Sequence, residues 1–131
     1  KTPFISDDGI ADPAFVTAAG GVQNAEGVYM SFLKDPRNDP ASKSVVDELK
    51  KAGSDAEGFT LYSYAAVQAV AAALAANKDV TDGTKLADWL KANPVPTVTG
   101  NKGWDEKGDL KSNDFVLYVW DKDGKYVEYK Q

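Results

Sequence analysis

The feature that most constrains the fold is an apolar run in the middle of the chain. Residues 64–76 (YAAVQAVAAALAA) carry one strongly polar side chain, that of Gln68. The run is too short to cross a bilayer, which needs about 20 apolar residues. In a helix beginning near Thr60, its Ala, Val and Leu side chains lie all round the circumference, and such a helix packs on several sides. The run therefore predicts a buried helix in a larger layered fold than 131 residues readily provide.

Strand-like and helical patterns alternate on both sides of this helix. Asp12, Ser42 and Asp82 can each cap a helix, and the predicted helices occupy 14–20, 43–52 and 83–92. Strands are expected at 4–6, 26–33, 97–99, 115–120 and 125–129, and the last two flank the turn signal DKDG. This order predicts an α/β fold with a parallel sheet, helices on both of its faces and a terminal β-hairpin.

The composition excludes several classes of function. The net charge is −5, which argues against a nucleic-acid partner, because phosphates need a basic surface. Cysteine and histidine are both absent, so the chain has no thiolate nucleophile, no histidine base and no zinc site of the Cys/His kind. No P-loop, G-x-G-x-x-G or G-x-S-x-G motif occurs. We therefore expect no enzyme, no metal and no cofactor.

An acidic turn follows the first predicted strand. Asp7, Asp8 and Gly9 lie where open α/β sheets place their ligands, at the carboxyl end of a strand. A carboxylate there could hold a ligand ammonium through a charge-assisted hydrogen bond. The alternative is an ordinary turn in which Asp serves local backbone groups. The residues alone leave both interpretations open.

Aromatic residues cluster where the long helix begins. Phe59, Tyr62 and Tyr64 could line a pocket for an apolar side chain, or they could pack the helix onto a sheet. Two further acidic segments, 104–109 and 121–124, do not have the spacing of a calcium loop. We interpret the first as a polar loop and the second as a hairpin turn.

Taken in order, several segments resemble one protein family: FISDDGIADPAF, AEGVYMSFL, FTLYSYAAVQAVAAAL, KLADWLKA, TVTGNKGWDEKGDLK and VLYVWDKDGKYVEY. They are similar to the C-terminal part of type I periplasmic binding proteins of the branched-chain amino-acid (Leu/Ile/Val) branch. The resemblance implies two α/β lobes joined by crossing strands. Residues 1–131 would be the C-terminal portion: 1–27 a piece of one lobe, 28–32 a crossing strand, 33–98 mainly the other lobe, and 99–131 a crossing region with the terminal strands.

The resemblance also implies a function and a site. The protein would be the solute-binding component of an ABC importer, in the periplasm, with its leader and its N-terminal part outside this chain. It would hold an amino acid between the lobes and deliver it to a membrane permease. Asp8 would bind the α-ammonium and Phe59 would contact the side chain, with Asp7, Gly9 and Tyr62 as pocket neighbours. A ligand-sensing regulator of the same fold, and a fragment that binds nothing alone, are the alternatives.

Overall fold

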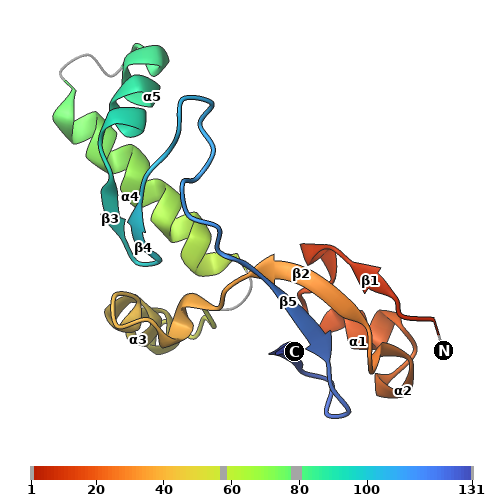
Figure 1. The fold of residues 1–131 in the computed structure, drawn as a ribbon. Helices are drawn as coiled ribbons and strands as arrows, with labels where there is room; N and C mark the ends of the chain where they lie inside the picture. The colour runs from red at the N-terminus through yellow and green to blue at the C-terminus, as the bar shows by residue number, and fades with distance from the viewer. Residues whose placement is uncertain (1, 57–58, 78–80, 131) are drawn as a thin grey trace. The chain divides into compact units, whose positions relative to one another are not determined.

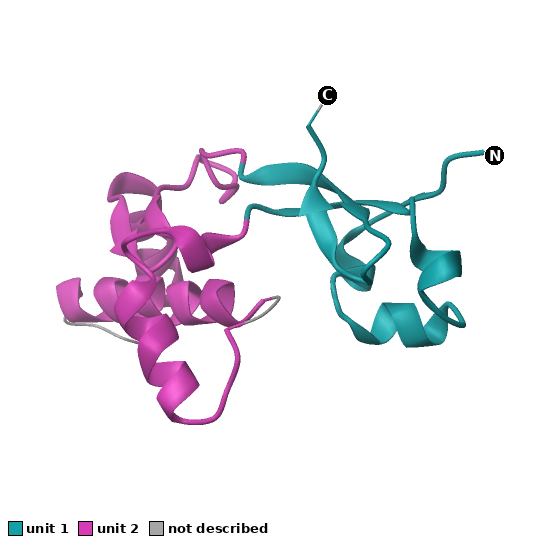
Figure 2. Cartoon of the chain, turned by 90° about the horizontal axis from the view of Figure 1, so that it is seen from below, with its two compact units in different colours: residues 1–34, 114–131 teal, residues 35–113 magenta. Residues whose placement is uncertain are grey.

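The computed structural model describes residues 2–56, 59–77 and 81–130. The chain divides into two compact units, which are coloured separately in Figure 2. Unit 1 contains residues 1–34 and 114–131, and unit 2 contains residues 35–113. The chain therefore leaves unit 1 after Lys34 and returns to it at Asp114.

Unit 1 is built on a four-stranded sheet with the order β1 (Ile5–Ser6), β2 (Tyr29–Leu33), β5 (Phe115–Trp120) and β6 (Tyr126–Glu128). β1 pairs with β2 in parallel, whereas the pairs β2–β5 and β5–β6 are antiparallel. Three short helices connect β1 to β2 (Figure 1): η1 (Asp8–Ile10), α1 (Ala14–Ala18) and α2 (Val22–Ala25).

The core of unit 1 follows from the alternation of side chains along β2. Met30 and Phe32 are buried on one face, and Ser31 between them is exposed. Met30 and Phe32 pack with Ala11 and Tyr118, so the core joins the segment after η1 to the two central strands. Aromatic contacts add to this core: the centroid of the Trp120 ring lies 5.3 Å from that of Phe15 in α1 and 5.2 Å from that of Tyr126 in β6.

The predicted α/β class and the terminal β-hairpin are confirmed. The hairpin is the pair β5–β6, in which Trp120 faces Tyr126. The sheet that the structure describes is mixed, and its parallel part is the single pair β1–β2. The reason is topological: the helical segment 8–25 returns the chain to the start of β2, whereas β5 and β6 are joined by a tight turn that reverses direction.

Unit 2 gathers around one long helix. It contains η2 (Pro36–Asn38), α3 (Lys43–Lys51), α4 (Thr60–Ala76), α5 (Gly83–Ala92) and the hairpin of β3 (Val95–Thr97) and β4 (Gly100–Lys102). α4 packs against α5 and β3. Its core cluster contains Val45, Leu61, Ala65 and Val98. No helix in the described ranges is both long enough and apolar enough to span a membrane.

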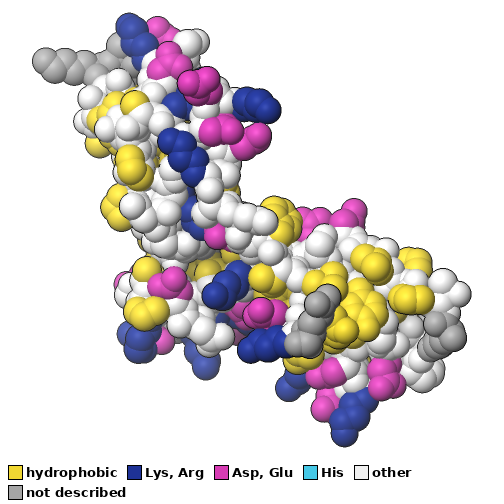
Figure 3. Space-filling model, in the orientation of Figure 1, with side chains coloured by type: hydrophobic (Ala, Val, Ile, Leu, Met, Phe, Trp, Pro, Cys, Tyr) yellow, Lys and Arg dark blue, Asp and Glu magenta, His cyan; other side chains and the backbone are white. Residues whose placement is uncertain are grey.

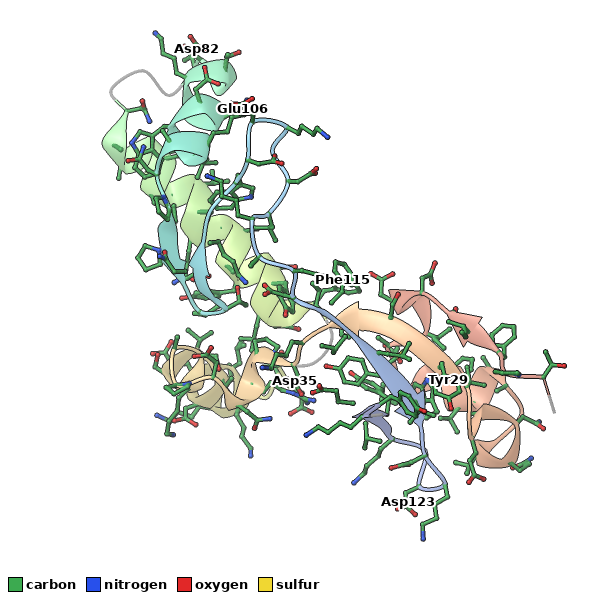
Figure 4. All side chains as sticks on the ribbon, viewed as in Figure 1. Tyr29, Asp35, Asp82, Glu106, Phe115 and Asp123 are labelled. Carbon is green, nitrogen blue, oxygen red and sulfur yellow. The ribbon has the colours of Figure 1, made fainter. Side chains whose placement is uncertain are left out.

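Several predicted elements are confirmed where the local signals are strong. α4 begins at Thr60, α5 occupies Gly83–Ala92 and β5 occupies Phe115–Trp120. Asp82 caps α5 as expected (Figure 4), since its carboxylate accepts hydrogen bonds from the backbone N–H groups of Thr84 and Lys85 at 3.1 and 3.2 Å.

Two predicted details differ from the structure, and one element was not predicted. Ser42 occupies the N-cap position of α3, but its side chain makes no capping hydrogen bond: it is fully buried and its hydroxyl donates to the carbonyls of Pro36 and Asp39, which ties η2 to the helix. The strand expected at 97–99 is instead β3, which ends at Thr97, and residues 98–99 form the turn to β4. The helix α2 was not expected, because four residues are too few to show a helical period.

Candidate functional site

The acidic turn after β1 is held in place by the core of unit 1. β1 ends at Ser6 and η1 follows at once, so the turn lies at the carboxyl end of a strand that pairs in parallel with β2. Ala11 after η1 is buried against Met30, and Ile10 packs on the same cluster. The turn is therefore a fixed feature of the sheet edge that lies at the carboxyl ends of both parallel strands.

The two carboxylates of this turn have different roles. The side chain of Asp7 caps η1 by accepting a hydrogen bond from the backbone N–H of Gly9 at 3.1 Å. The Asp8 side chain is partly buried, and no described residue donates a hydrogen bond or pairs a cation to its carboxylate. The turn interpretation therefore holds for Asp7, whereas Asp8 presents a carboxylate that the unit itself leaves uncompensated.

The predicted aromatic residues lie at the start of α4 in unit 2. Phe59 is the residue just before the helix, and its carbonyl accepts from the N–H of Ser63 at 2.8 Å. Its side chain is 49% exposed, and Tyr62 is partly buried. Leu61 anchors this turn in the core of unit 2. Residues three apart share a helix face, so Phe59 and Tyr62 project from the same side of the turn.

The structure thus brings the predicted residues together in two sets. Asp7, Asp8 and Gly9 share one turn of unit 1, and Phe59 and Tyr62 share one turn of unit 2. That the two sets face one ligand remains a prediction.

Both of the other acidic segments are hairpin turns. Asp105 accepts hydrogen bonds from the N–H groups of Lys107 and Asp109, both at 2.9 Å, and Trp104 bridges to Leu110. Asp121 accepts from the N–H groups of Asp123 and Lys125, also at 2.9 Å. In each loop the carboxylate of one aspartate accepts backbone hydrogen bonds of the turn. This confirms the interpretation of 121–124 as a hairpin turn. Figure 4 shows Glu106 and Asp123 projecting from these loops.

The shifted pKa values of Asp35, Lys43 and Asp47 arise from local ion pairs in unit 2. Burial opposes the charged form of Asp35, but hydrogen bonds and the positive charge of Arg37 outweigh it and lower the pKa of this carboxyl group. The hydrogen bond between Lys43 and Asp47 raises the pKa of the lysine and lowers that of the aspartate. The shifts in both ion pairs have a local structural cause, at η2 or in α3, so neither ion pair indicates a ligand site.

One pocket of about 540 Å³ lies within unit 1, away from the predicted residues. It is lined mainly by the segment before β1, by α1 and α2, and by the start of β2, including Phe4, Phe15, Glu26 and Tyr29. No sequence pattern indicates it, because segments that are distant along the chain form its walls. Among the described residues, no group of three or more Asp or Glu side chains is placed to hold a metal ion.

The chain is similar in sequence to proteins named for amino-acid binding. An amino acid binding protein of Pseudomonas aeruginosa is 50% identical over 123 residues, which are 94% of this chain and 33% of that protein. The Leu/Ile/Val-binding protein homolog 1 of Brucella suis is 43% identical over 135 residues (100% and 35%). The Leu/Ile/Val-binding protein of Escherichia coli is 37% identical over 131 residues (99% and 34%). No family model matches the chain.

Solved structures share the fold. A leucine binding protein LivK from Thermotoga maritima superposes with a TM-score of 0.76 at 20% identity, over 96% of this chain and 36% of that one. An ABC transporter substrate-binding protein from Desulfitobacterium hafniense, in complex with Leu, gives a TM-score of 0.71 at 22% identity, over 98% and 36%. The chain spans about a third of the length of the curated relatives it matches. Over nearly its whole length, this chain is therefore similar in sequence to about a third of the length of proteins named as amino acid binding or Leu/Ile/Val-binding proteins, and it shares the fold of the matching third of solved substrate-binding proteins.

Proposed function

We propose that the chain is the C-terminal portion of the solute-binding component of an ABC importer, a periplasmic protein that binds an amino acid and delivers it to a membrane permease. The observation that carries this proposal is the 50% identity to an amino acid binding protein across nearly the whole chain. The names of the other relatives favour Leu, Ile or Val, or a similar apolar amino acid. The proposed activity is binding without chemistry, in keeping with relatives that are named as binding proteins.

The division into two units supports a two-lobe arrangement. We propose that unit 1 is a piece of one lobe and unit 2 a piece of the other, with a crossing strand at 28–32 and a crossing region within 99–131. The chain passes between the units at Lys34 and again at Asp114. In this proposal the amino acid lies between the lobes, and a hinge movement closes them over it.

Asp8 is the residue proposed to hold the ligand ammonium. The turn that carries it is anchored by the packing of Ile10 and Ala11, and its carboxylate has no partner among the described residues, which suits it to a cation supplied from outside. An ammonium brought against it would form a charge-assisted hydrogen bond. Exclusion of water on closure would strengthen this pair, because the Coulomb energy rises as the effective dielectric constant falls.

Phe59 is proposed to select the ligand side chain, with Tyr62 beside it. A half-exposed aromatic ring at a fixed helix start is a suitable wall for an apolar side chain. Discrimination by such a wall is modest, about 1–3 kcal/mol for each methylene gained or lost. Asp8 would thus recognise the amino-acid class, and Phe59 would bias the choice within it.

The test uses a chimera in which this chain replaces the matching third of the Pseudomonas aeruginosa relative. We expect Asp8→Asn to weaken leucine binding at least tenfold in isothermal calorimetry, because the amide keeps the shape of the side chain and removes its charge. Asp7→Asn is the matched control: it removes one charge from the same turn, and its amide oxygen can still accept from Gly9. Unchanged affinity in Asp8→Asn, or equal losses in both variants, would contradict a direct role for Asp8.

Whether the isolated chain binds an amino acid is a separate question. If amino-acid binding needs two complete walls, the chain alone gives no heat with leucine while the chimera binds it. Because the chain spans about a third of its relatives, we propose this outcome. Heat from the isolated chain, lost in Asp8→Asn, would instead place the whole site on these residues.

A further inference from the structure

The pocket within unit 1 has room for a small organic ligand, since it measures about 540 Å³ and pockets for such ligands span about 300 to 1,000 Å³. Its apolar lining includes Phe4, Phe15, Ala19 and Val28. The Phe15 ring is supported from the core, because its centroid lies 5.3 Å from that of the fully buried Trp120 ring. Figure 3 shows hydrophobic side chains gathered on the surface of unit 1. The pocket thus offers an apolar wall that is anchored in the core of the unit.

Two polar side chains of this pocket present hydrogen-bond acceptors. Glu26 is the one charged residue in the described lining, and no described residue donates a hydrogen bond or pairs a cation to its carboxylate. Asn24 directs its Nδ2 amino group to the carbonyl of Ala19 at 2.8 Å, which leaves its Oδ1 atom as an acceptor. A carboxylate and an amide oxygen therefore stand on the same pocket as the apolar wall.

The backbone next to Glu26 has no N–H group to spare for a ligand. The N–H groups of residues 27–29 all donate to backbone carbonyls, at 2.9 to 3.0 Å. No Lys or Arg occurs in the described lining. An anionic group would therefore meet the Glu26 carboxylate without a compensating cation, whereas an ammonium group would meet acceptors that lack a donor.

We propose that this pocket binds a small primary amine with an apolar body, and that it is a second site whose lining includes neither Asp8 nor Phe59. The ammonium donates to the Glu26 carboxylate and to Oδ1 of Asn24. The apolar body lies against Phe15, where an aromatic ring gains most from offset stacking or an edge-to-face contact. A free amino acid is disfavoured, because its own carboxylate would approach Glu26.

Phenethylamine is the probe for this site, and titration followed by nitrogen-15 NMR of the chain locates where it binds. We expect the amide signals of residues 26–29 to shift. The indole N–H of Trp120 should shift with them, because it is buried without a hydrogen-bond partner among the described residues and its ring lies against Phe15. Two analogues separate charge from shape: 2-phenylethanol lacks the ammonium, and phenylalanine adds a carboxylate. Each should bind at least fivefold more weakly, a modest factor because Glu26 is exposed.

The variant that tests the carboxylate is Glu26→Gln, which keeps the shape of the side chain and removes its charge. We expect it to weaken phenethylamine binding at least fivefold. The matched control is Glu128→Gln, in β6 of the same unit, which removes one charge from an exposed residue outside the pocket lining and should leave the affinity unchanged. Both side chains are exposed, so we expect both variants to fold, and unchanged amide signals outside the pocket verify this.

Several outcomes would overturn the proposal. Equal affinities for phenethylamine and 2-phenylethanol, or for Glu26→Gln and the unchanged chain, would show an apolar cavity without amine recognition. Shifts confined to residues 7–10 would assign the amine to the proposed amino-acid site instead. Repeating the titration on the chimera with the Pseudomonas aeruginosa relative adds a further check, because loss of binding there would show that residues of the relative fill the pocket. The leucine titration is a separate measurement, so either result can fail without the other.

Discussion

At the scale of single residues, the chain uses one turn design twice. Asp105 and Asp121 each open a loop in which the carboxylate accepts two backbone N–H groups and the residue four positions later closes the turn through its carbonyl. A glycine with positive φ stands third after each aspartate: Gly108 at 94° and Gly124 at 71°. The two loops differ in what surrounds this glycine, which makes them a natural pair for comparison.

We expect Gly124→Ala to destabilise the protein more than Gly108→Ala. Both substitutions force an L-residue into the left-handed region, at about 1–2 kcal/mol. A Cβ at Gly108 would meet open space, whereas one at Gly124 would lie 3.0 Å from a methyl carbon of Val22, a short side chain with little freedom to move away. Urea unfolding of the two variants checks the order, and equal losses would show that α2 yields to the added methyl group.

At the scale of helices and strands, sequence signals that lie within a few residues of an element predict it well, whereas contacts with more distant segments are not predicted. The capping carboxylate of Asp82 and the alternating run of β5 lie within a few residues of the structure they specify. Ser42 carries the same capping signal, but its hydroxyl serves the carbonyls of η2, six and three residues earlier. Pro96 lies within β3, although proline usually argues against a strand; it is tolerated in a short two-stranded hairpin.

In the candidate site, too, the sequence predicts local structure but not the packing between distant segments. The turn at 7–9 could be predicted from Asp-Asp-Gly, and the structure adds that Asp7 is the residue whose carboxylate accepts the backbone hydrogen bond within the turn. Packing, through Ile10 and Ala11, explains why the turn is fixed, and no local pattern contains that information. The prediction that Asp8 and Phe59 contact the same ligand rests on family resemblance, because no local sequence pattern relates residues that are so far apart in the chain.

The α4–β3 contact leads to a prediction at this scale. Gln68→Ala removes the acceptor for the N–H of Val98, which lies in a buried turn, and an unpaired buried donor costs about 1–3 kcal/mol. We expect lower stability in urea and faster hydrogen exchange at the Val98 amide. Gln68→Glu is the control, since it keeps an acceptor oxygen and should retain more protection. Unchanged exchange at Val98 in the alanine variant would show that this hydrogen bond does not hold the hairpin on α4.

At the scale of the whole chain, unit 2 is an insertion between two paired strands of unit 1. Leu33 at the end of β2 faces Phe115 at the start of β5. Beyond them, the N–H of Lys34 donates to the carbonyl of Asp114 at 2.7 Å. The two ends of unit 2 are therefore adjacent, as insertion into a β-hairpin requires.

This topology predicts that residues 35–113 can be removed without separating β2 from β5. Joining Lys34 to Asp114 through Asn-Gly supplies a two-residue hairpin turn of the favoured kind. We expect retained cross-strand NOEs between Phe32 and Val116, which are register partners. The control joins Leu33 to Asp114 through the same turn, which shifts the register by one residue and exchanges the two faces of the strand. Loss of the NOEs in the first variant would show that unit 1 depends on unit 2 for its strand pairing.

The adjacency of Lys34 and Asp114 also constrains the order in which the chain folds. Pairing β2 with β5 closes a loop that contains all of unit 2, and loop entropy makes this about 3 kcal/mol costlier than closing a two-residue hairpin. Unit 2 is continuous in sequence, so its contacts can form first. We expect unit 2, once folded, to keep its two ends near each other and so to shorten the effective loop. The slow, non-local pairing of β2 with β5 would thereby become a nearly local step, in which the folded insertion guides the formation of the sheet.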